Sequence, residues 1–250
     1  LFGGYARYWY QAMIERVRGF GGVLPAAGLV RMGIEGKWGQ FAKCVAQPMG
    51  TDRHLAFLLQ KEQAIMRVRR GYSSQASDKA LHEIFDPLFA LPWQDRVNQS
   101  MAADVSTWLA DESLMRSDKM TMAHGLEERV PLLDLELVRL AMRIPSKWKI
   151  GSREQGKRIL IDAWKDVLPP HVLEQEKRAF MSPAAKWMRG TMYEFVRERL
   201  RAGGRGEFGA LVDFGAAEEL LKDHVDKTQY NLHLIWALVC LEGWGRKISV

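Results

Sequence analysis

The chain has 250 residues, enough for one large domain with a hydrophobic core or for two small ones. Its formal charge of +6 is compatible with an anionic ligand, but no basic face interleaved with aromatic residues indicates nucleic-acid binding. The two cysteines, Cys44 and Cys240, lie far apart. This argues against a disulfide scaffold and a zinc site, and fits a reducing, cytoplasmic setting. No apolar run reaches the length that spans a bilayer, so no membrane association is expected.

Helical periodicity dominates the first half of the chain, and the period-two alternation of strands is scarce. Thr51 or Asp52 and Ser77 or Asp78 are candidate N-caps, and Pro87 is expected to end the helix that begins at residue 77 or 78. The expected helices cover residues 5–18, 51–70, 77–86 and 92–110.

The second half continues the helical pattern. We expect a helix capped by Asp134 and stopped by Pro145, a helix around Leu160 to Val167, a long helix from Ser182-Pro183 through Leu200, a helix beginning at Asp213, and a last helix from about Leu232. The last one is apolar on almost all sides and is therefore expected to be central. These patterns predict a mainly α fold and a single helical domain over residues 1–250.

The most informative stretch is residues 118–134, DKMTMAHGLEERVPLLD. Pro131 disfavours a helical conformation at Val130, so we expect a helix to end there. Glu127 and Glu128 would then lie at a helix C-terminus, where the macrodipole disfavours carboxylates. Two carboxylates placed against that preference indicate a role other than stability.

This run resembles the signature of the synthetase domain of glutamine-hydrolysing asparagine synthetases, with Lys119 in place of the usual Arg and Leu132 in place of the usual Phe. Residues 104–114, 156–160, 177–187 and 236–244 resemble further elements of that family. Gln175 and Ala179 depart from it, since Arg and Gly are usual there. The resemblance therefore covers essentially the whole chain.

The resemblance implies the helical C-terminal portion of an adenine-nucleotide α-hydrolase-like (PP-loop) synthetase domain, with the nucleotide-binding sheet half missing. It implies ATP and Mg²⁺ as cofactors of the full-length protein only. The partners would be aspartate or another carboxylate substrate, and ammonia from an N-terminal glutaminase domain. A homodimer is compatible with this assignment. Because the sequence begins at Leu1 rather than Met, we expect a piece of a longer polypeptide.

The resemblance also implies roles for individual residues. Lys177 would be the catalytic cation that stabilises negative charge, and Glu127 would orient or deprotonate the nitrogen nucleophile. Asp118 and Arg129 would support the substrate site. Simpler readings stay open: Lys177 as a surface lysine, Glu127 in an ion pair with Arg129 or Lys119, and Asp118 as an N-cap. We interpret His124 as a packed or hydrogen-bonded histidine rather than a catalyst.

Two phosphate-binding patterns are relevant. Residues 151–158 nearly spell a P-loop, but Arg158 occupies the position of the required Ser or Thr. The family's Ser-Gly-Gly-x-Asp-Ser loop, which binds pyrophosphate at a helix N-terminus, does not occur in this sequence. We therefore predict that this chain alone neither binds ATP tightly nor makes amide.

Two other functions stay open. The departures at Lys119, Leu132, Gln175 and Ala179 allow a related amide-forming or cyclising enzyme of a biosynthetic cluster, of the β-lactam or lasso-peptide type. The third reading is a non-catalytic helical interaction module that has lost its nucleotide loop.

Overall fold

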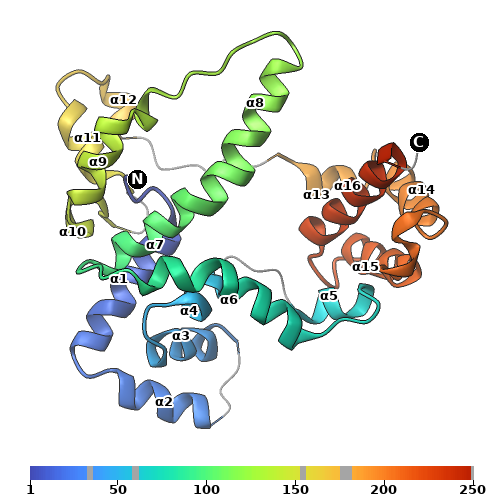
Figure 1. Cartoon of the computed structure of the whole chain (residues 1–250), viewed down its shortest axis with the longest axis horizontal. Coiled ribbons are helices and arrows are strands. Elements are labelled where there is room, and N and C mark those ends of the chain that lie inside the picture. The colour runs from blue at the N-terminus through green and yellow to red at the C-terminus, as the bar shows by residue number, and fades with distance from the viewer. Residues whose placement is uncertain (33–35, 58–61, 153–155, 175–181, 249–250) are drawn as a thin grey trace. The chain divides into compact units, whose positions relative to one another are not determined.

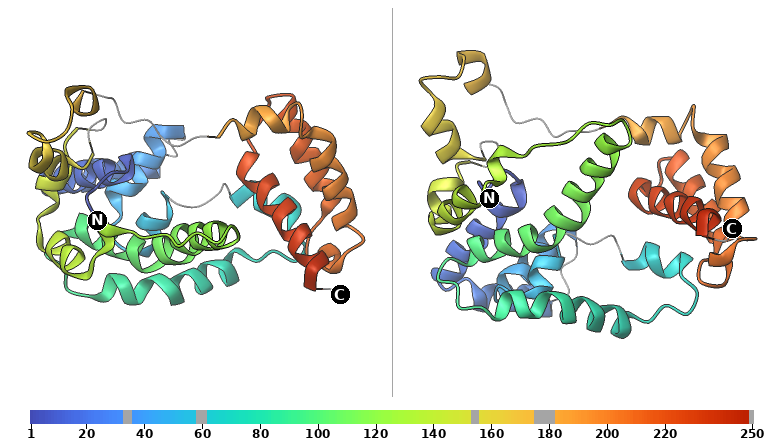
Figure 2. Two further views of the ribbon diagram at one scale, coloured as in Figure 1. Left: turned by 90° about the horizontal axis from the view of Figure 1, so that it is seen from above. Right: turned by 45° about the horizontal axis from the view of Figure 1, so that its top comes forward.

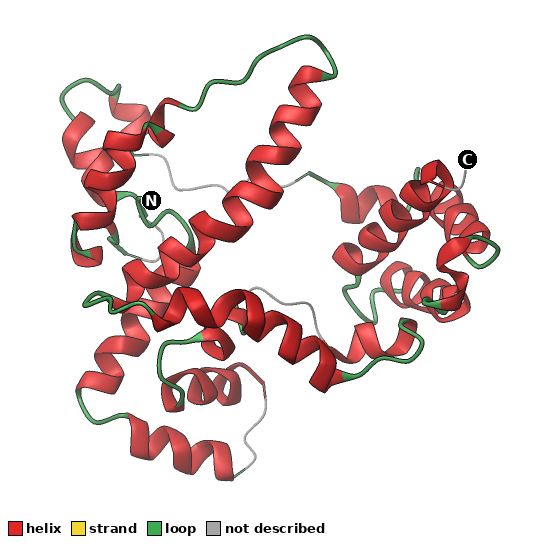
Figure 3. Cartoon of the chain, viewed as in Figure 1, coloured by secondary structure: helices red, strands yellow, loops and turns green. Residues whose placement is uncertain are grey.

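The computed structural model describes residues 1–32, 36–57, 62–152, 156–174 and 182–248. In these ranges the regular structure is helical, apart from two isolated bridges that join Arg69 to Val212 and Ile150 to Gly156 (Figure 3). The prediction of a mainly α fold is confirmed. None of the helices in these ranges combines the length and apolar character that crossing a lipid bilayer requires.

The chain forms two compact units. Unit 1 comprises residues 1–57 and 78–178, and unit 2 comprises residues 58–77 and 179–250. The single-domain expectation stays a prediction, because two compact units can belong to one domain. Lys177 lies outside the described residues.

Unit 1 contains most of the helices (Figures 1 and 2). They are α1 (Ala6–Gly19), α2 (Val23–Arg31), α3 (Gly36–Ala46), α4 (Thr51–Leu55), most of α6 (Ser74–Ala90), α7 (Arg96–Asp104), the π-helix η1 (Val105–Leu114), α8 (Met115–Met122), the 3₁₀ turn η2 (Pro131–Leu133), α9 (Leu135–Arg143), α10 (Ser146–Lys149), α11 (Arg158–Trp164) and α12 (Pro170–Leu173).

Unit 1 has two small apolar clusters. One surrounds Ile14 and Val45 in α1 and α3, and the other surrounds Tyr8 and Met101 in α1 and α7. Helix α1 contributes to both clusters and ends close to the predicted Gly19. It is therefore the element around which unit 1 packs.

Unit 2 has its own core. Its helices are α5 (Glu62–Val68), α13 (Ala184–Met188), α14 (Tyr193–Gly203), the 3₁₀ turn η3 (Glu207–Ala210), α15 (Phe214–Val225) and α16 (Leu232–Ile248). Leu200, Leu220 and Ile235 are fully buried among α14, α15 and α16. The expected central position of the last helix holds for its Ile235 and Leu238 face, while Trp236 is exposed.

Helix α6 differs from its prediction at both ends. It begins at Ser74 rather than at residue 77 or 78, and the Ser73 hydroxyl accepts from the Ala76 N–H. It also continues through Pro87 to Ala90. The side-chain amide of buried Gln99 donates to the carbonyls of three residues at the end of the helix, Leu88, Phe89 and Leu91. These bonds from α7 satisfy carbonyls that a helix C-terminus leaves unpaired.

Two further predictions were wrong. Neither Thr51 nor Asp52 caps α4, because their side chains instead reach across to α6, where Thr51 donates to Asp86 and Asp52 accepts from His82. The expected helix from residue 182 to 200 is two helices, α13 and α14, separated by a turn at Gly190. The low helix propensity of Gly190 explains the break.

The two aspartate caps were predicted correctly. Asp134 accepts from the backbone N–H groups of Glu136 and Leu137 at the start of α9. Asp213 accepts from the Ala216 N–H at the start of α15. These two caps are local interactions within four residues, which the sequence indicates when no contact with another helix competes, as one does at Thr51 and Asp52.

Candidate functional site

The signature segment, residues 118–134, leaves its helix earlier than expected. Helix α8 ends at Met122, and Gly125 adopts a positive φ of 69°. The Gly125 N–H donates to the Met122 carbonyl, and the Leu126 N–H donates to the Thr121 carbonyl. This is a glycine-terminated helix end. The prediction that Pro131 ends the helix was wrong, since Pro131 instead begins a 3₁₀ turn after a non-helical Val130.

Glu127 and Arg129 lie in the non-helical stretch beyond this helix end, not at a helix C-terminus as expected. An ion pair joins Arg129 Nη2 to Glu127 Oε1 at 2.7 Å, and their side chains are 82% and 65% exposed. The geometry therefore agrees with the simpler interpretation, in which Glu127 is the ion-pair partner of Arg129. An exposed ion pair contributes little free energy, so it does not prevent either group from contacting a ligand.

Asp118 lies inside α8, which continues directly from the π-helix before it. Its N-cap interpretation was therefore wrong. The side chain is exposed, and among the described residues its carboxylate forms no ion pair. His124 Nδ1 lies 3.0 Å from the Met120 carbonyl oxygen, so the interpretation of a hydrogen-bonded histidine agrees with the structure.

Lys177, Gln175 and Ala179 fall outside the described residues. The structure brings Glu127 and Arg129 together and places Asp118 on the helix that leads to them. The catalytic roles of Lys177 and Glu127 stay predictions.

Exposed apolar side chains precede and follow the Glu127–Arg129 ion pair in the sequence. Helix α8 and η1 have no buried residue. The large apolar side chains exposed in the segment and its approach are Met115, Met120, Met122, Leu126, Val130 and Leu132. Exposed apolar surface next to charged groups is typical of interaction sites.

Sequence reasoning missed a buried polar cluster at the end of α7. Asp104 accepts a hydrogen bond from the Tyr8 hydroxyl and pairs with Arg7 Nη2 at 2.7 Å. His54 Nε2 lies 3.4 Å from the other Asp104 oxygen, and His54 Nδ1 lies 3.0 Å from the Ser100 hydroxyl. Burial and the Asp104 carboxylate raise the pKa of Tyr8. No local sequence pattern links these residues, because they come from α1, α4 and α7.

Ser100, His54 and Asp104 stand in the order of a nucleophile, a base and an orienting acid. All three are almost completely buried. A substrate cannot reach the Ser100 hydroxyl, so we assign the cluster a structural rather than a nucleophilic role.

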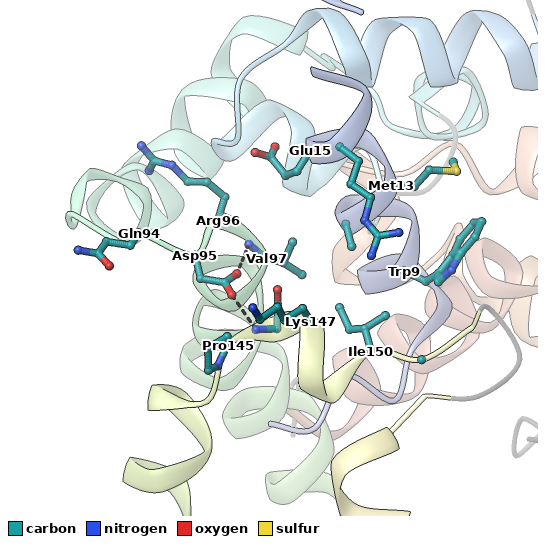
Figure 4. Close-up of a pocket in the computed structure, with 14 residues that line it drawn as sticks. Trp9, Met13, Glu15, Gln94, Asp95, Arg96, Val97, Pro145, Lys147 and Ile150 are labelled. Carbon is teal, nitrogen blue, oxygen red and sulfur yellow. Dashed lines mark hydrogen bonds between the residues drawn. The ribbon is translucent and has the colours of Figure 1, made fainter. Parts of the chain in front are cut away.

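A pocket of about 510 Å³ lies in unit 1 beside the start of α7 (Figure 4). Asp95, in its wall, accepts from the backbone N–H groups of Val97 and Asn98 through one oxygen and of Ser146 through the other. Both oxygens of this carboxylate are therefore occupied. The second carboxylate of the wall, Glu15, is paired with a buried residue, Arg53.

The remaining wall of this pocket is apolar at Trp9 and Ile150 and cationic at Arg16 and Lys147. Both carboxylates of the wall are already paired, so neither is free to act as a general base. We assign no reaction to the pocket.

Within the described ranges no three His, Cys, Asp or Glu side chains converge to hold a metal ion. In the P-loop look-alike, Gly156 packs on the backbone of Gly3 and Gly4, and a Cβ there would lie 2.7 Å from the Gly3 oxygen. This glycine therefore serves packing.

Comparison with known proteins identifies the family. The family model described as asparagine synthase matches residues 1–246. "Asparagine synthetase [glutamine-hydrolyzing] 1" of Bacillus subtilis (strain 168) is 31% identical over 148 residues, which are 59% of this chain and 23% of that protein. A "Putative asparagine synthetase [glutamine-hydrolyzing]" of Mycobacterium bovis is 33% identical over 151 residues, 60% of this chain and 22% of that protein.

A plant relative, "Asparagine synthetase [glutamine-hydrolyzing] 1" of Lotus japonicus, is 38% identical over 73 residues, 26% of this chain and 12% of that protein. The chain thus spans less than a quarter of the length of the curated relatives it matches. No solved structure matches it. Because the family model covers nearly the whole sequence, the chain belongs to the asparagine synthase family.

Proposed function

We propose that this chain is the helical portion of an ATP-dependent ligase that makes asparagine from aspartate and glutamine-derived ammonia. The observation that carries the proposal is the signature segment. Its Glu127 and Arg129 stand together on an exposed stretch beyond α8, and the family model spans residues 1–246. The names of the bacterial relatives support the reaction.

The reaction would proceed in two steps. The substrate carboxylate attacks the α-phosphate of ATP and gives an acyl-adenylate and pyrophosphate. Ammonia then attacks the acyl carbon, and AMP leaves. Both steps build negative charge on phosphoryl or acyl oxygens, and a fixed cation near that charge is worth a factor of about 10²–10³ in rate. We assign this role to Lys177.

Glu127 would act on the nitrogen nucleophile in the second step. A carboxylate can orient the attacking nitrogen and accept its proton. The exposure of the Glu127 side chain and the weakness of an exposed ion pair leave its carboxylate able to exchange Arg129 for a ligand. Arg129 would then hold the carboxylate in place between turnovers.

An ATP–pyrophosphate exchange assay on the full-length protein tests the proposal. With a panel of carboxylates, we expect exchange that depends on aspartate. Exchange with another carboxylate only would indicate the related amide-forming or cyclising enzymes. No exchange with any carboxylate would contradict the proposal and favour the non-catalytic interaction module.

Calorimetry on this 250-residue chain tests the accompanying prediction that it lacks a nucleotide site of its own. We expect no binding of ATP at micromolar concentration, because the pyrophosphate-binding loop of the family does not occur in the sequence. Micromolar binding would contradict this prediction.

A further inference from the structure

The helical run that leads to the signature segment is buried at one end and exposed at the other. Most residues of α7 are buried, whereas η1 and α8 bury none. In Figures 1 and 2 this run extends outward from α7 to the far end of α8, which carries the loop that returns to α9. The direction of α8 is therefore set mainly where the run leaves the core, at Asp104.

Residues from two other helices lie against Asp104 at this point. Its carboxylate is 3% exposed and receives the Tyr8 hydroxyl and the Arg7 guanidinium from α1. His54 from α4 lies 3.4 Å from its second oxygen. Charge-assisted hydrogen bonds to a buried carboxylate are short and directional. The bonds from Arg7 and Tyr8 therefore fix the last turn of α7 relative to α1. Helix α4 is joined to α7 one turn earlier, where His54 Nδ1 lies 3.0 Å from the Ser100 hydroxyl.

The contacts of Arg7 extend into the first turn of the π-helix. The Arg7 guanidinium lies over the rings of Tyr5, Tyr8 and Trp108, at 5.0, 5.3 and 5.7 Å from their centroids. Trp108 belongs to η1, and its ring meets that of Tyr5 edge to face at 5.5 Å. The change from α to π winding thus occurs within this aromatic and charged cluster. Such changes of winding are frequent at functional sites.

We propose that Asp104 is a positioning residue for the signature segment. Its carboxylate, held by Arg7 and Tyr8, sets the direction of η1 and α8 and with it the place where Glu127 meets its ligand. Asp104 itself touches no substrate. The consequence for catalysis rests on the function proposed above, while the consequence for the helix does not.

The distance between two spin labels in the full-length protein tests whether Asp104 sets the direction of η1 and α8. The labels are attached at Lys119→Cys on α8 and Lys43→Cys on α3, with the exposed Cys240 replaced by Ser. We expect Asp104→Asn to broaden the distance distribution. Asp111→Asn, which changes an exposed carboxylate on the same helical run, should leave it unchanged. An unchanged distribution in Asp104→Asn would overturn the proposal.

Tyr8→Phe provides a second variant if Asp104→Asn does not fold. It removes one donor to Asp104 and keeps the ring beside Arg7. We expect a smaller broadening in the same direction. A folded Tyr8→Phe protein with the parent distribution would also contradict the proposal.

Steady-state kinetics of amide formation test whether Asp104 also matters for catalysis through the position of Glu127. Asp104→Asn and Tyr8→Phe should lower kcat while the KM for ATP stays unchanged, because a displaced Glu127 impairs the chemical step rather than nucleotide binding. Asp111→Asn should retain both constants. Broadened distances with an unchanged kcat would refute the link to catalysis. Broadened distances in a protein that makes no amide even as wild type would show instead that the proposed function is wrong.

Discussion

Glu127 and Arg129 form an exposed ion pair, and this arrangement separates two roles for the same carboxylate. If Glu127 serves only the pair, removing either partner has the same effect. If Glu127 acts on the nitrogen nucleophile, its removal costs activity that the removal of Arg129 does not. The two roles therefore differ in kinetics although they share one geometry.

We predict that Glu127→Gln in the full-length protein lowers kcat for amide formation by about 10²-fold or more, as expected when a general base is lost. The neighbouring exposed carboxylate provides the control, so Glu128→Gln should retain activity. Arg129→Gln should have a smaller effect. Equal losses for Glu127→Gln and Arg129→Gln would mean that only the ion pair matters.

His82 of α6 has an acidic partner at each ring nitrogen, one in α4 and one in its own helix. Nε2 lies 2.9 Å from an Asp52 oxygen, and Nδ1 lies 2.9 Å from an Asp86 oxygen. Hydrogen bonds raise the pKa of His82, and the bond to Asp86 contributes more than the bond to Asp52. Only the imidazolium can donate from both nitrogens at once.

The contribution of His82 to stability should therefore depend on pH. A histidine with a raised folded pKa stabilises fully below its unfolded pKa of about 6.5, and this contribution is lost as the pH rises through the folded pKa. We predict that His82→Gln lowers the free energy of unfolding at pH 5.5 and has no effect at pH 9. Urea titrations at both pH values measure this difference. His171→Gln, at an exposed histidine, is the control, and a pH-independent effect of His82→Gln would contradict the account.

At the scale of elements, Gly125 determines where α8 ends and where the signature segment begins. Its positive φ favours glycine, and no atom lies within 4 Å of a Cβ built there. A substitution at this position therefore tests backbone strain alone.

We predict that Gly125→Ala destabilises unit 1 by about 1 kcal/mol, because alanine is strained in the left-handed region. Gly28→Ala is the matched change inside α2, where a Cβ also meets no atom and φ is not positive. It should stabilise by about 0.4–1 kcal/mol through helix propensity and the unfolded chain. Denaturant unfolding compares the two variants, and equal effects would mean that the helix end does not depend on Gly125.

The elements that the sequence predicted well are those fixed by local contacts. The caps at Asp134 and Asp213 involve residues two or three positions away. The path of α6 through Pro87 depends instead on Gln99, which belongs to another helix. The hydrophobic periodicity of the sequence does not reveal a contact between two helices. The end of α6 could therefore not be predicted.

The candidate site shows the same division. The signature residues were found from their own order in the sequence, and the Glu127–Arg129 pair lies within that order. The Asp104 cluster joins residues from α1, α4 and α7, which are distant in sequence. Burial brings these charges together, and a single sequence does not reveal burial of that kind.

At the scale of the whole molecule, the two units have separate apolar cores. Met101 is fully buried in unit 1, and Leu220 is fully buried in unit 2. A cavity made in one core should therefore lower the stability of that unit.

We predict that Leu220→Ala destabilises unit 2 by about 2–5 kcal/mol, the usual cost of a large-to-small change in a packed core. Hydrogen exchange of the backbone amides of α14, α15 and α16 should accelerate accordingly. Leu211→Ala, at an exposed leucine of the same unit, should change exchange little. A similar acceleration in both variants would show that the core around Leu220 does not support these helices.

The central claim is that this chain supplies Lys177 to a ligase that activates a carboxylate with ATP. The most direct test is aspartate-dependent ATP–pyrophosphate exchange by the full-length protein and its Lys177→Ala variant. The account predicts a loss of about 10²-fold or more in Lys177→Ala. It predicts wild-type exchange in Lys186→Ala, the control at an exposed lysine further along the sequence. Wild-type exchange in a folded Lys177→Ala protein would contradict it.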